Sequence, residues 1–93
     1  MFHHLTGTLS SATPEEAVID CNGVGYFVKI PLSTYEALPP SGRRVTLLAH
    51  LQVKEDALTL YGFLTEAERR FFRQLIQHVD GVGPRLAMAV LSR

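Results

Sequence analysis

The sequence predicts a small closed β-barrel followed by a pair of short helices. Five stretches of β-type sequence lie before residue 64, with a short helical stretch between the third and the fourth. Five strands with a small helix in that place are typical of the OB fold. After residue 64, apolar residues at helical spacing stand on both sides of a six-residue break, 79–84, that contains two glycines and a proline. Such a break predicts a helix–hairpin–helix segment.

The first three strands are joined by short turns. Residues 2–9 are expected to form the first strand, and the Thr-Pro-Glu-Glu sequence at 13–16 has the composition of a turn. The second strand is expected at 17–21 and the third at 24–30. Between them, Asn22-Gly23 is the strongest short hairpin signal in the chain.

The last two strands form a longer hairpin after the short helix. That helix is expected at 32–38, one or two turns long, with Ser33 as its N-cap. The fourth strand is expected at 45–53 and the fifth at 57–63. The polar residues 54–56 form the turn between them.

Thr65 begins the helical part of the chain. The Thr-Glu-Ala-Glu sequence at 65–68 has the form of a capping box, in which the Thr65 hydroxyl and the Glu68 carboxylate each satisfy a free backbone amide. The first helix is expected to end near His78 and the second to begin near Pro84. No stop signal precedes the last residue, so we expect the natural chain to continue.

The composition is that of an ordinary globular domain. Of the 93 residues, 46% are hydrophobic and 19% are charged. No apolar run approaches the roughly 20 residues that cross a membrane, and the first ten residues lack the apolar core of a signal peptide. The single cysteine, Cys21, cannot form a disulfide within the chain, which favours a reducing cytoplasm.

The net charge is zero, but the two parts of the chain differ in charge. Residues 1–65 contain four lysines and arginines against six carboxylates, a net charge of −2. Residues 66–93 contain five arginines against three carboxylates, a net charge of +2. Because the basic part also carries the glycine-rich break, an anionic ligand is favoured there.

The sequence contains no recognisable catalytic or metal site. The nucleotide-binding pattern Gly-x-x-x-x-Gly-Lys-Ser/Thr is absent, and no serine stands in a nucleophile elbow. The histidines are not joined to cysteines at zinc spacing, and neighbours His3 and His4 on a strand should point to opposite faces. We therefore expect no catalytic residue, no metal and no cofactor in this chain.

The break at 79–84 has two interpretations. With no side chains at Gly81 and Gly83, another backbone can approach closely and positive φ is accessible. Pro84 suits the first turn of a helix, whose free N–H groups and positive dipole end would then face outward and bind a phosphate. The alternative is a tight turn between two helices that binds nothing.

The acidic pair Glu55-Asp56 also has two interpretations. Two adjacent acids at the tip of a hairpin are usually only a solvated turn. In a nucleic-acid-binding protein, however, each carboxylate would repel a nearby phosphate by about 1 kcal/mol at a separation of about 4 Å in water. Such a tip would push DNA strands apart or exclude them from a position.

Six short motifs stand in order along the chain: Leu5-Thr-Gly-Thr-Leu, Asn22-Gly-Val-Gly-Tyr, Leu51-Gln-Val-Lys-Glu-Asp-Ala, Leu60-Tyr-Gly-Phe, Phe72-Arg-Gln-Leu-Ile and Gly81-Val-Gly-Pro-Arg-Leu-Ala. At these spacings they resemble the RuvA family of bacterial Holliday junction-binding proteins, over nearly the whole chain. Three departures are visible. Phe2-His3 follows Met1 where the family usually begins Met-Ile-Gly, Asp80 replaces the more familiar Asn, and Arg85 replaces the common Lys.

The resemblance implies an architecture and a set of binding residues. Residues 1–64 would be an OB barrel that forms oligomers and the core of a junction complex, and 65–93 the first of two helix–hairpin–helix motifs. Backbone amides at 81–83 (Gly81, Val82, Gly83) would hold DNA phosphates, with Arg85 adding positive charge. Glu55-Asp56 would be the family's acidic pin, which separates strands.

The resemblance also implies partners. Family members are homotetramers that hold a four-way DNA junction open in a square-planar form, with one or two tetramers around one junction. They present the junction to the RuvB motor, which uses ATP and binds through a C-terminal domain outside these 93 residues, and they work with the RuvC resolvase in recombination and repair. No membrane is involved.

Two alternatives remain open from the residues themselves. The first is a generic DNA-binding module with OB and helix–hairpin–helix parts but no preference for junctions. The second is a purely structural assembly domain in which Gly-Val-Gly-Pro only turns the chain. DNA binding separates the second from the others, and a preference for four-way DNA separates the first from a junction-specific protein.

Overall fold

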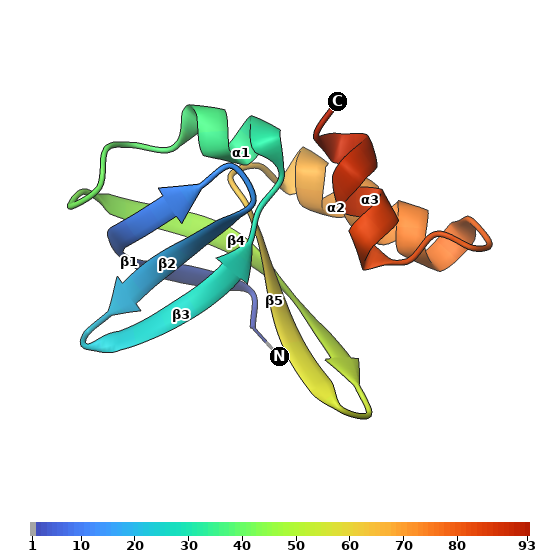
Figure 1. The fold of residues 1–93 in the computed structure, drawn as a ribbon, viewed down its shortest axis with the longest axis horizontal. Coiled ribbons are helices and arrows are strands. Elements are labelled where there is room, and N and C mark those ends of the chain that lie inside the picture. Colours follow the sequence, from blue (N-terminus) through green and yellow to red (C-terminus); the bar gives the residue numbers. More distant parts are fainter. Residues whose placement is uncertain (1) are drawn as a thin grey trace.

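A computed structural model describes residues 2–93, which form five strands and three helices (Figure 1). In chain order the elements are β1 His4–Thr13, β2 Glu16–Cys21, β3 Val24–Lys29, α1 Leu32–Ala37, β4 Arg44–Lys54, β5 Ala57–Phe63, α2 Glu66–His78 and α3 Pro84–Leu91. No helix within 2–93 is long and apolar enough to cross a membrane.

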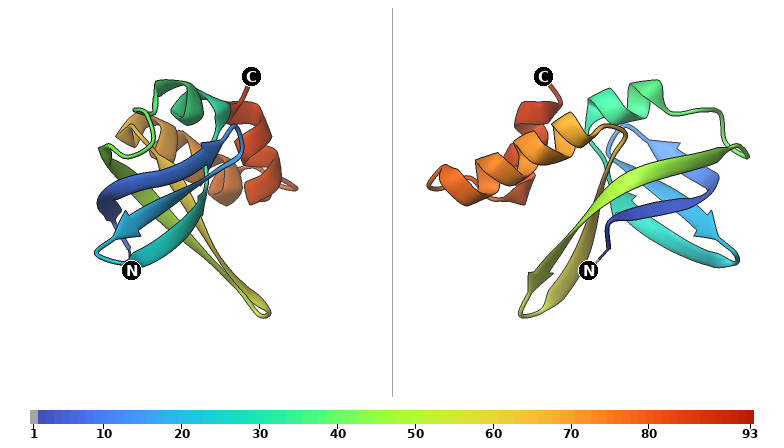
Figure 2. Two further views of the ribbon diagram at one scale, coloured as in Figure 1. Left: turned by 60° about the vertical axis from the view of Figure 1, so that its left-hand side comes forward. Right: turned by 180° about the vertical axis from the view of Figure 1, so that it is seen from behind.

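The five strands close into a barrel in the order β1-β2-β3-β5-β4, with β4 pairing back onto β1. All neighbours are antiparallel except β3 and β5. Those two run parallel where Val28 pairs with Leu60 and Lys29 with Tyr61. Helix α1 connects β3 to β4 across one end of the barrel (Figure 2). This confirms the predicted OB fold.

β1 is longer and begins later than the 2–9 stretch predicted from the sequence. It pairs with β4 from His4 to Thr8 and with β2 from Thr8 to Thr13. The register against β2 shifts between Leu9 and Ser11, which leaves one extra residue on β1. Such a bulge bends a strand, and the bend lets β1 serve two neighbours. The polar residues after Leu9 are therefore part of the barrel, although their sequence does not have the pattern of a strand.

The Asn22-Gly23 hairpin is confirmed. Both residues have positive φ, 53° for Asn22 and 92° for Gly23, which is the backbone of the tight turns that suit the twist of β-hairpins. The N–H of Gly23 also donates to the Asp20 carboxylate at 2.7 Å. The Gly-Val-Gly tripeptide that recurs in the helical part here ends a hairpin turn at Gly23 and begins β3 at Val24.

Buried apolar residues form two separate clusters. The first fills the barrel and is made by inward-facing residues of its strands together with Ile30, which follows β3: Leu5, Leu9, Ala17, Ile19, Val28, Ile30, Val45 and Leu47. The second joins the helices to the end of β5 through Phe63, Phe72 and Ala87, each with no exposed surface. The helical arm α2–α3 is therefore packed onto the barrel, with hydrophobic burial as the main driving force.

The caps of two helices differ from the sequence prediction. Helix α1 has Pro31 as its N-cap, with no side-chain cap, so the prediction of Ser33 was wrong. The Ser33 hydroxyl instead donates to the Glu68 carboxylate. Thr65 caps α2 as predicted, accepting from the Glu68 N–H at 3.2 Å. The Glu68 carboxylate, however, accepts from the hydroxyls of Thr65, Ser33 and Thr34. Only half of the capping box forms because Glu68 is used to link α2 to α1.

Candidate nucleic-acid interface

The acidic pair lies at the tip of a two-stranded ribbon that projects from the barrel (Figure 1). β4 and β5 pair continuously from Leu48–Phe63 to Lys54–Ala57. β4 pairs with β1 only as far as Leu48, and β5 pairs with β3 only at residues 60–61. The N–H of Ala49 still donates to the His3 carbonyl at 2.9 Å. Farther along, the ribbon pairs with no other strand of residues 2–93, and Glu55 and Asp56 are exposed at its end.

The predicted phosphate loop forms the far end of the helical arm. The N–H of Val82 donates to the Val79 carbonyl at 3.2 Å, which closes a turn, and Gly81 within it has a φ of +79°. Glycine is favoured at that position because L side chains rarely adopt such a φ. Gly83 is different: its φ is −91° and its ψ 179°, which is ordinary extended backbone.

The loop is open to an approaching ligand. A Cβ atom built on Gly81 or Gly83 would meet no heavy atom within 4 Å. Within residues 2–93, the N–H groups of Gly81 and Gly83 donate no hydrogen bond to the chain. Gly83 is the N-cap of α3 and makes no side-chain cap there, so the first N–H groups of the helix share this exposure. The geometry is that of an anion-binding helix start.

The two predicted sites lie on separate arms of the molecule. In Figure 1 the β4–β5 ribbon and the α2–α3 arm diverge from the place where β5 leads into α2, and Figure 2 shows the same opening from behind. The acidic tip is at the end of one arm and the glycine loop at the end of the other. The structure thus keeps the predicted repulsive and attractive groups apart, with an open angle between them.

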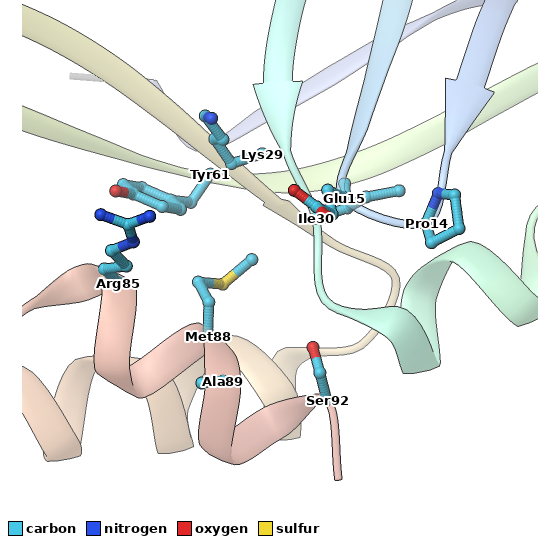
Figure 3. A pocket seen from close by; sticks show the side chains of 9 residues that line it. All are labelled: Pro14, Glu15, Lys29, Ile30, Tyr61, Arg85, Met88, Ala89 and Ser92. Atoms are coloured by element: carbon cyan, nitrogen blue, oxygen red, sulfur yellow. The ribbon is translucent and has the colours of Figure 1, made fainter.

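A cleft of about 640 Å³ lies at the inner corner, between the barrel and α3 (Figure 3). Arg85 reaches into it from the first turn of α3, toward the hydroxyl of Tyr61, with Lys29 beyond. Glu15 and Ser92 lie at the other end of the cleft. The remaining lining residues are apolar: Pro14, Ile30, Met88 and Ala89. Arg85 therefore belongs both to the glycine loop and to this cleft.

Arg69 fixes the helical arm to the barrel. Its side chain is only 3% exposed although it carries a full charge. The guanidinium donates to the His3 carbonyl at 2.7 Å, to the Ala49 carbonyl at 3.2 Å and to the Glu66 carboxylate. The hydrogen bond from Arg69 also lowers the pKa of Glu66 below its usual value. A buried charge is tolerated when it is paired and hydrogen-bonded in this way.

His50 and Arg73 form a second contact between the barrel and α2. Arg73 Nε donates to His50 Nδ1 at 3.1 Å. Because Arg has only donors, Nδ1 must be the unprotonated ring nitrogen, and Nε2–H then donates to Gln52 at 3.1 Å. Burial is the largest cause of the lowered pKa of His50; the Gln52 bond raises it, and the charges of Arg73 and Arg69 lower it. The neutral imidazole packs edge-on against Phe72, with ring centroids 5.3 Å apart.

The positive charge available to a ligand is smaller than the sequence suggests. Arg69 is buried and paired, and Arg73 is partly buried against His50. Arg70, Arg85 and Arg93 are the exposed arginines of the helical arm. Of these three, Arg85 is the one that lines the cleft. The exposed positive charge of the helical arm is therefore carried by three arginines rather than five.

Sequence reasoning missed three residues of this region. Arg69 stands among other arginines and reads as surface charge, although its spacing to Phe72 and Ile76 places it on the apolar face of α2. Lys29 and Tyr61 meet only because β3 and β5 pair in parallel, which no local pattern indicates. The expectation for His3 and His4 was wrong: His3 precedes β1, and the two rings meet edge to face with centroids 5.3 Å apart.

These features define a class of protein: a small OB barrel with an appended helical hairpin whose glycine turn is open to an anion. Comparison with known proteins is more specific. The family model described as the RuvA N terminal domain matches residues 1–62. The chain belongs to the RuvA N-terminal domain family.

Curated relatives match almost the whole chain. The Holliday junction branch migration complex subunit RuvA of Delftia acidovorans is 53% identical over 92 residues, and that of Chlorobium limicola is 54% identical over the same length. Each match covers 99% of this chain but only 48% and 45% of the relative. The chain spans about half the length of the curated relatives it matches.

Proposed function

We propose that the chain is a junction-specific DNA-binding subunit of a branch-migration complex and performs no catalysis itself. Its relatives carry the name of such a subunit. The observation that carries the proposal is the placement of an open glycine turn on one arm and an exposed acidic pair on the other, in a chain of the RuvA family. An attractive and a repulsive group at separate ends suit DNA that must be both held and opened.

The proposed mechanism gives one role to the glycine turn and another to the acidic pair. The free amides of Gly81 and Gly83 bind backbone phosphates of a duplex arm, and Arg85 adds charge. The Val82 N–H, predicted to act with them, instead donates to the Val79 carbonyl. Phosphate contacts position DNA without reading its sequence, so binding depends on the shape of the junction. Glu55-Asp56 repels the phosphates nearest to the crossover. The barrel, 1–64, forms the centre of a homotetramer that holds a junction in square-planar form.

The proposal includes partners. Residues 65–93 act as the first of two helix–hairpin–helix motifs, and the complex works in the cytoplasm during recombination and repair. RuvB supplies the ATPase motor and binds outside these residues. One or two tetramers of the protein surround a junction, and RuvC resolves the junction. The chain itself uses no ATP, metal or other cofactor.

Binding to DNA of different shapes tests the function. The full-length protein in its natural form is titrated, at one stated salt concentration, against a four-way junction, a duplex and a single strand built from the same sequences. We expect the junction to bind most tightly. Equal affinity for all three would favour a generic DNA-binding module, and no binding at low salt would favour a structural domain.

The acidic pair is tested by the double change Glu55→Gln and Asp56→Asn. Removing two anions per subunit takes away repulsion of about 1 kcal/mol for each close carboxylate–phosphate pair. We therefore expect junction affinity to stay the same or to increase, and strand opening at the crossover, followed by a fluorescent base analogue, to decrease. Loss of binding would mean that the acids are structural and that the repulsion model is wrong.

A further inference from the structure

The cleft between the barrel and α3 contains a positive group that the proposed loop does not include. Lys29 ends β3, is exposed, and lies opposite Tyr61 of β5 in the parallel pair. Both line the same cleft as Arg85 (Figure 3). Within residues 2–93 Lys29 makes no ion pair; its Nζ lies 5.9 Å from the centroid of the exposed Phe27 ring. Its charge is therefore available to a ligand.

Tyr61 adds a neutral donor beside this charge. Its ring is fixed by Phe72, with centroids 5.0 Å apart. Burial raises the pKa of Tyr61 above its usual value, so the phenol keeps its proton at neutral pH. A protonated hydroxyl in a cleft that is also lined by two cationic side chains can donate to an anionic oxygen. Lys29, Tyr61 and Arg85 thus offer one side of the cleft to an anion.

Acidic groups limit where an anion can bind. Glu15 lines the other end of the cleft, and Glu16 is the partner of Lys29 across the β2–β3 pair. An anion is therefore excluded from the Glu15 end and favoured at the mouth, where Arg85 stands. That mouth is continuous with the open glycine turn, because Arg85 belongs to the first turn of α3.

We propose that Lys29 and Tyr61 form a barrel-side binding point for a DNA backbone phosphate, on the same duplex arm that the glycine turn and Arg85 hold. The inference rests on the proposed function and extends it. The occupant is DNA rather than a small anion because the cleft is open and its Arg85 end adjoins the free amides of Gly81 and Gly83, so that successive phosphates of one strand meet donors on both sides. The arm would then be held by the barrel as well as by the helices.

The test uses Lys29→Gln in the full-length protein, with Arg43→Gln as a matched control. Arg43 is also exposed but lies just before β4 and does not line the cleft. For Lys29→Gln we expect roughly a threefold to tenfold loss of junction affinity, and a salt dependence of log affinity that is shallower by roughly 0.9 for each subunit engaged with an arm. Tyr61→Phe, which keeps the ring, should give a smaller loss in the same direction.

Each other outcome overturns the inference. Unchanged affinity and salt dependence in Lys29→Gln would exclude the contact, and equal losses in Lys29→Gln and Arg43→Gln would show only a diffuse charge effect. If inorganic phosphate at millimolar concentration bound in the cleft while the variants left DNA binding unchanged, the cleft would be a small-anion site. Failure of the proposed function looks different, because the unmodified protein would then not prefer the junction at all.

Discussion

Gly83→Asn is expected to weaken junction binding by roughly tenfold or more while leaving the chain as stable as before. Asn is among the best N-cap residues, and its φ and ψ preferences fit the extended backbone of Gly83, so the free energy of unfolding should change by only a few tenths of a kcal/mol. The same side chain would occupy the space in front of the free amides and bond to them in place of a phosphate. A charge-assisted hydrogen bond contributes about 1.5–3 kcal/mol, and about 1.4 kcal/mol corresponds to tenfold in affinity.

The measurement combines junction titration with urea unfolding of the same preparations. Gly81→Ala serves as the comparison, because the φ of +79° makes any side chain strained there and should lower stability by about 1 kcal/mol. Gly83→Asn thus separates loss of binding from loss of structure. Junction affinity unchanged in Gly83→Asn would eliminate the phosphate loop and leave a plain turn between helices.

Arg69→Met should destabilise the folded chain by about 3 kcal/mol. The change removes a buried guanidinium and its charge-assisted hydrogen bonds to the carbonyls of His3 and Ala49, each worth about 1.5–3 kcal/mol, while Met retains part of the apolar contact. Urea unfolding measures the effect as a lower midpoint with the same slope.

Arg70→Met is the matched control for Arg69→Met. Arg70 is the next residue of α2 and is exposed, so the same substitution should change stability by no more than about 0.5 kcal/mol. Equal effects of the two changes would mean that the buried network contributes nothing beyond helix propensity. Arg69→Lys should be intermediate, because a single ammonium lacks the planar fork that reaches several acceptors.

Much of the fold was predictable from local patterns. Asn22-Gly23, the polar tip at 54–56 and the capping Thr65 each act through their immediate neighbours, so the sequence contains their cause. Ser33 shows the limit of such reasoning, because its hydroxyl bonds to a residue 35 positions away. The continuation of β1 beyond Leu9 likewise depends on pairing with β2, not on the residues of β1.

The candidate site was predictable only in part. The glycine turn and the acidic pair are short motifs, and the structure leaves both exposed. Their separation on two arms depends on Arg69 and Phe72, which dock α2 onto the barrel through contacts between distant parts of the chain. The cleft depends on the parallel pairing of Lys29 and Tyr61. Long-range pairing of this kind has no local signal.

The bond between Arg69 and the His3 carbonyl also has a consequence for how the chain folds. It joins residues 66 positions apart, so it closes a loop that contains the whole barrel. Closing so long a loop costs entropy unless the intervening chain is already compact. The barrel is therefore expected to form first, with α2 docking afterwards, and the docked arm is the part most easily released in a partial opening of the native state.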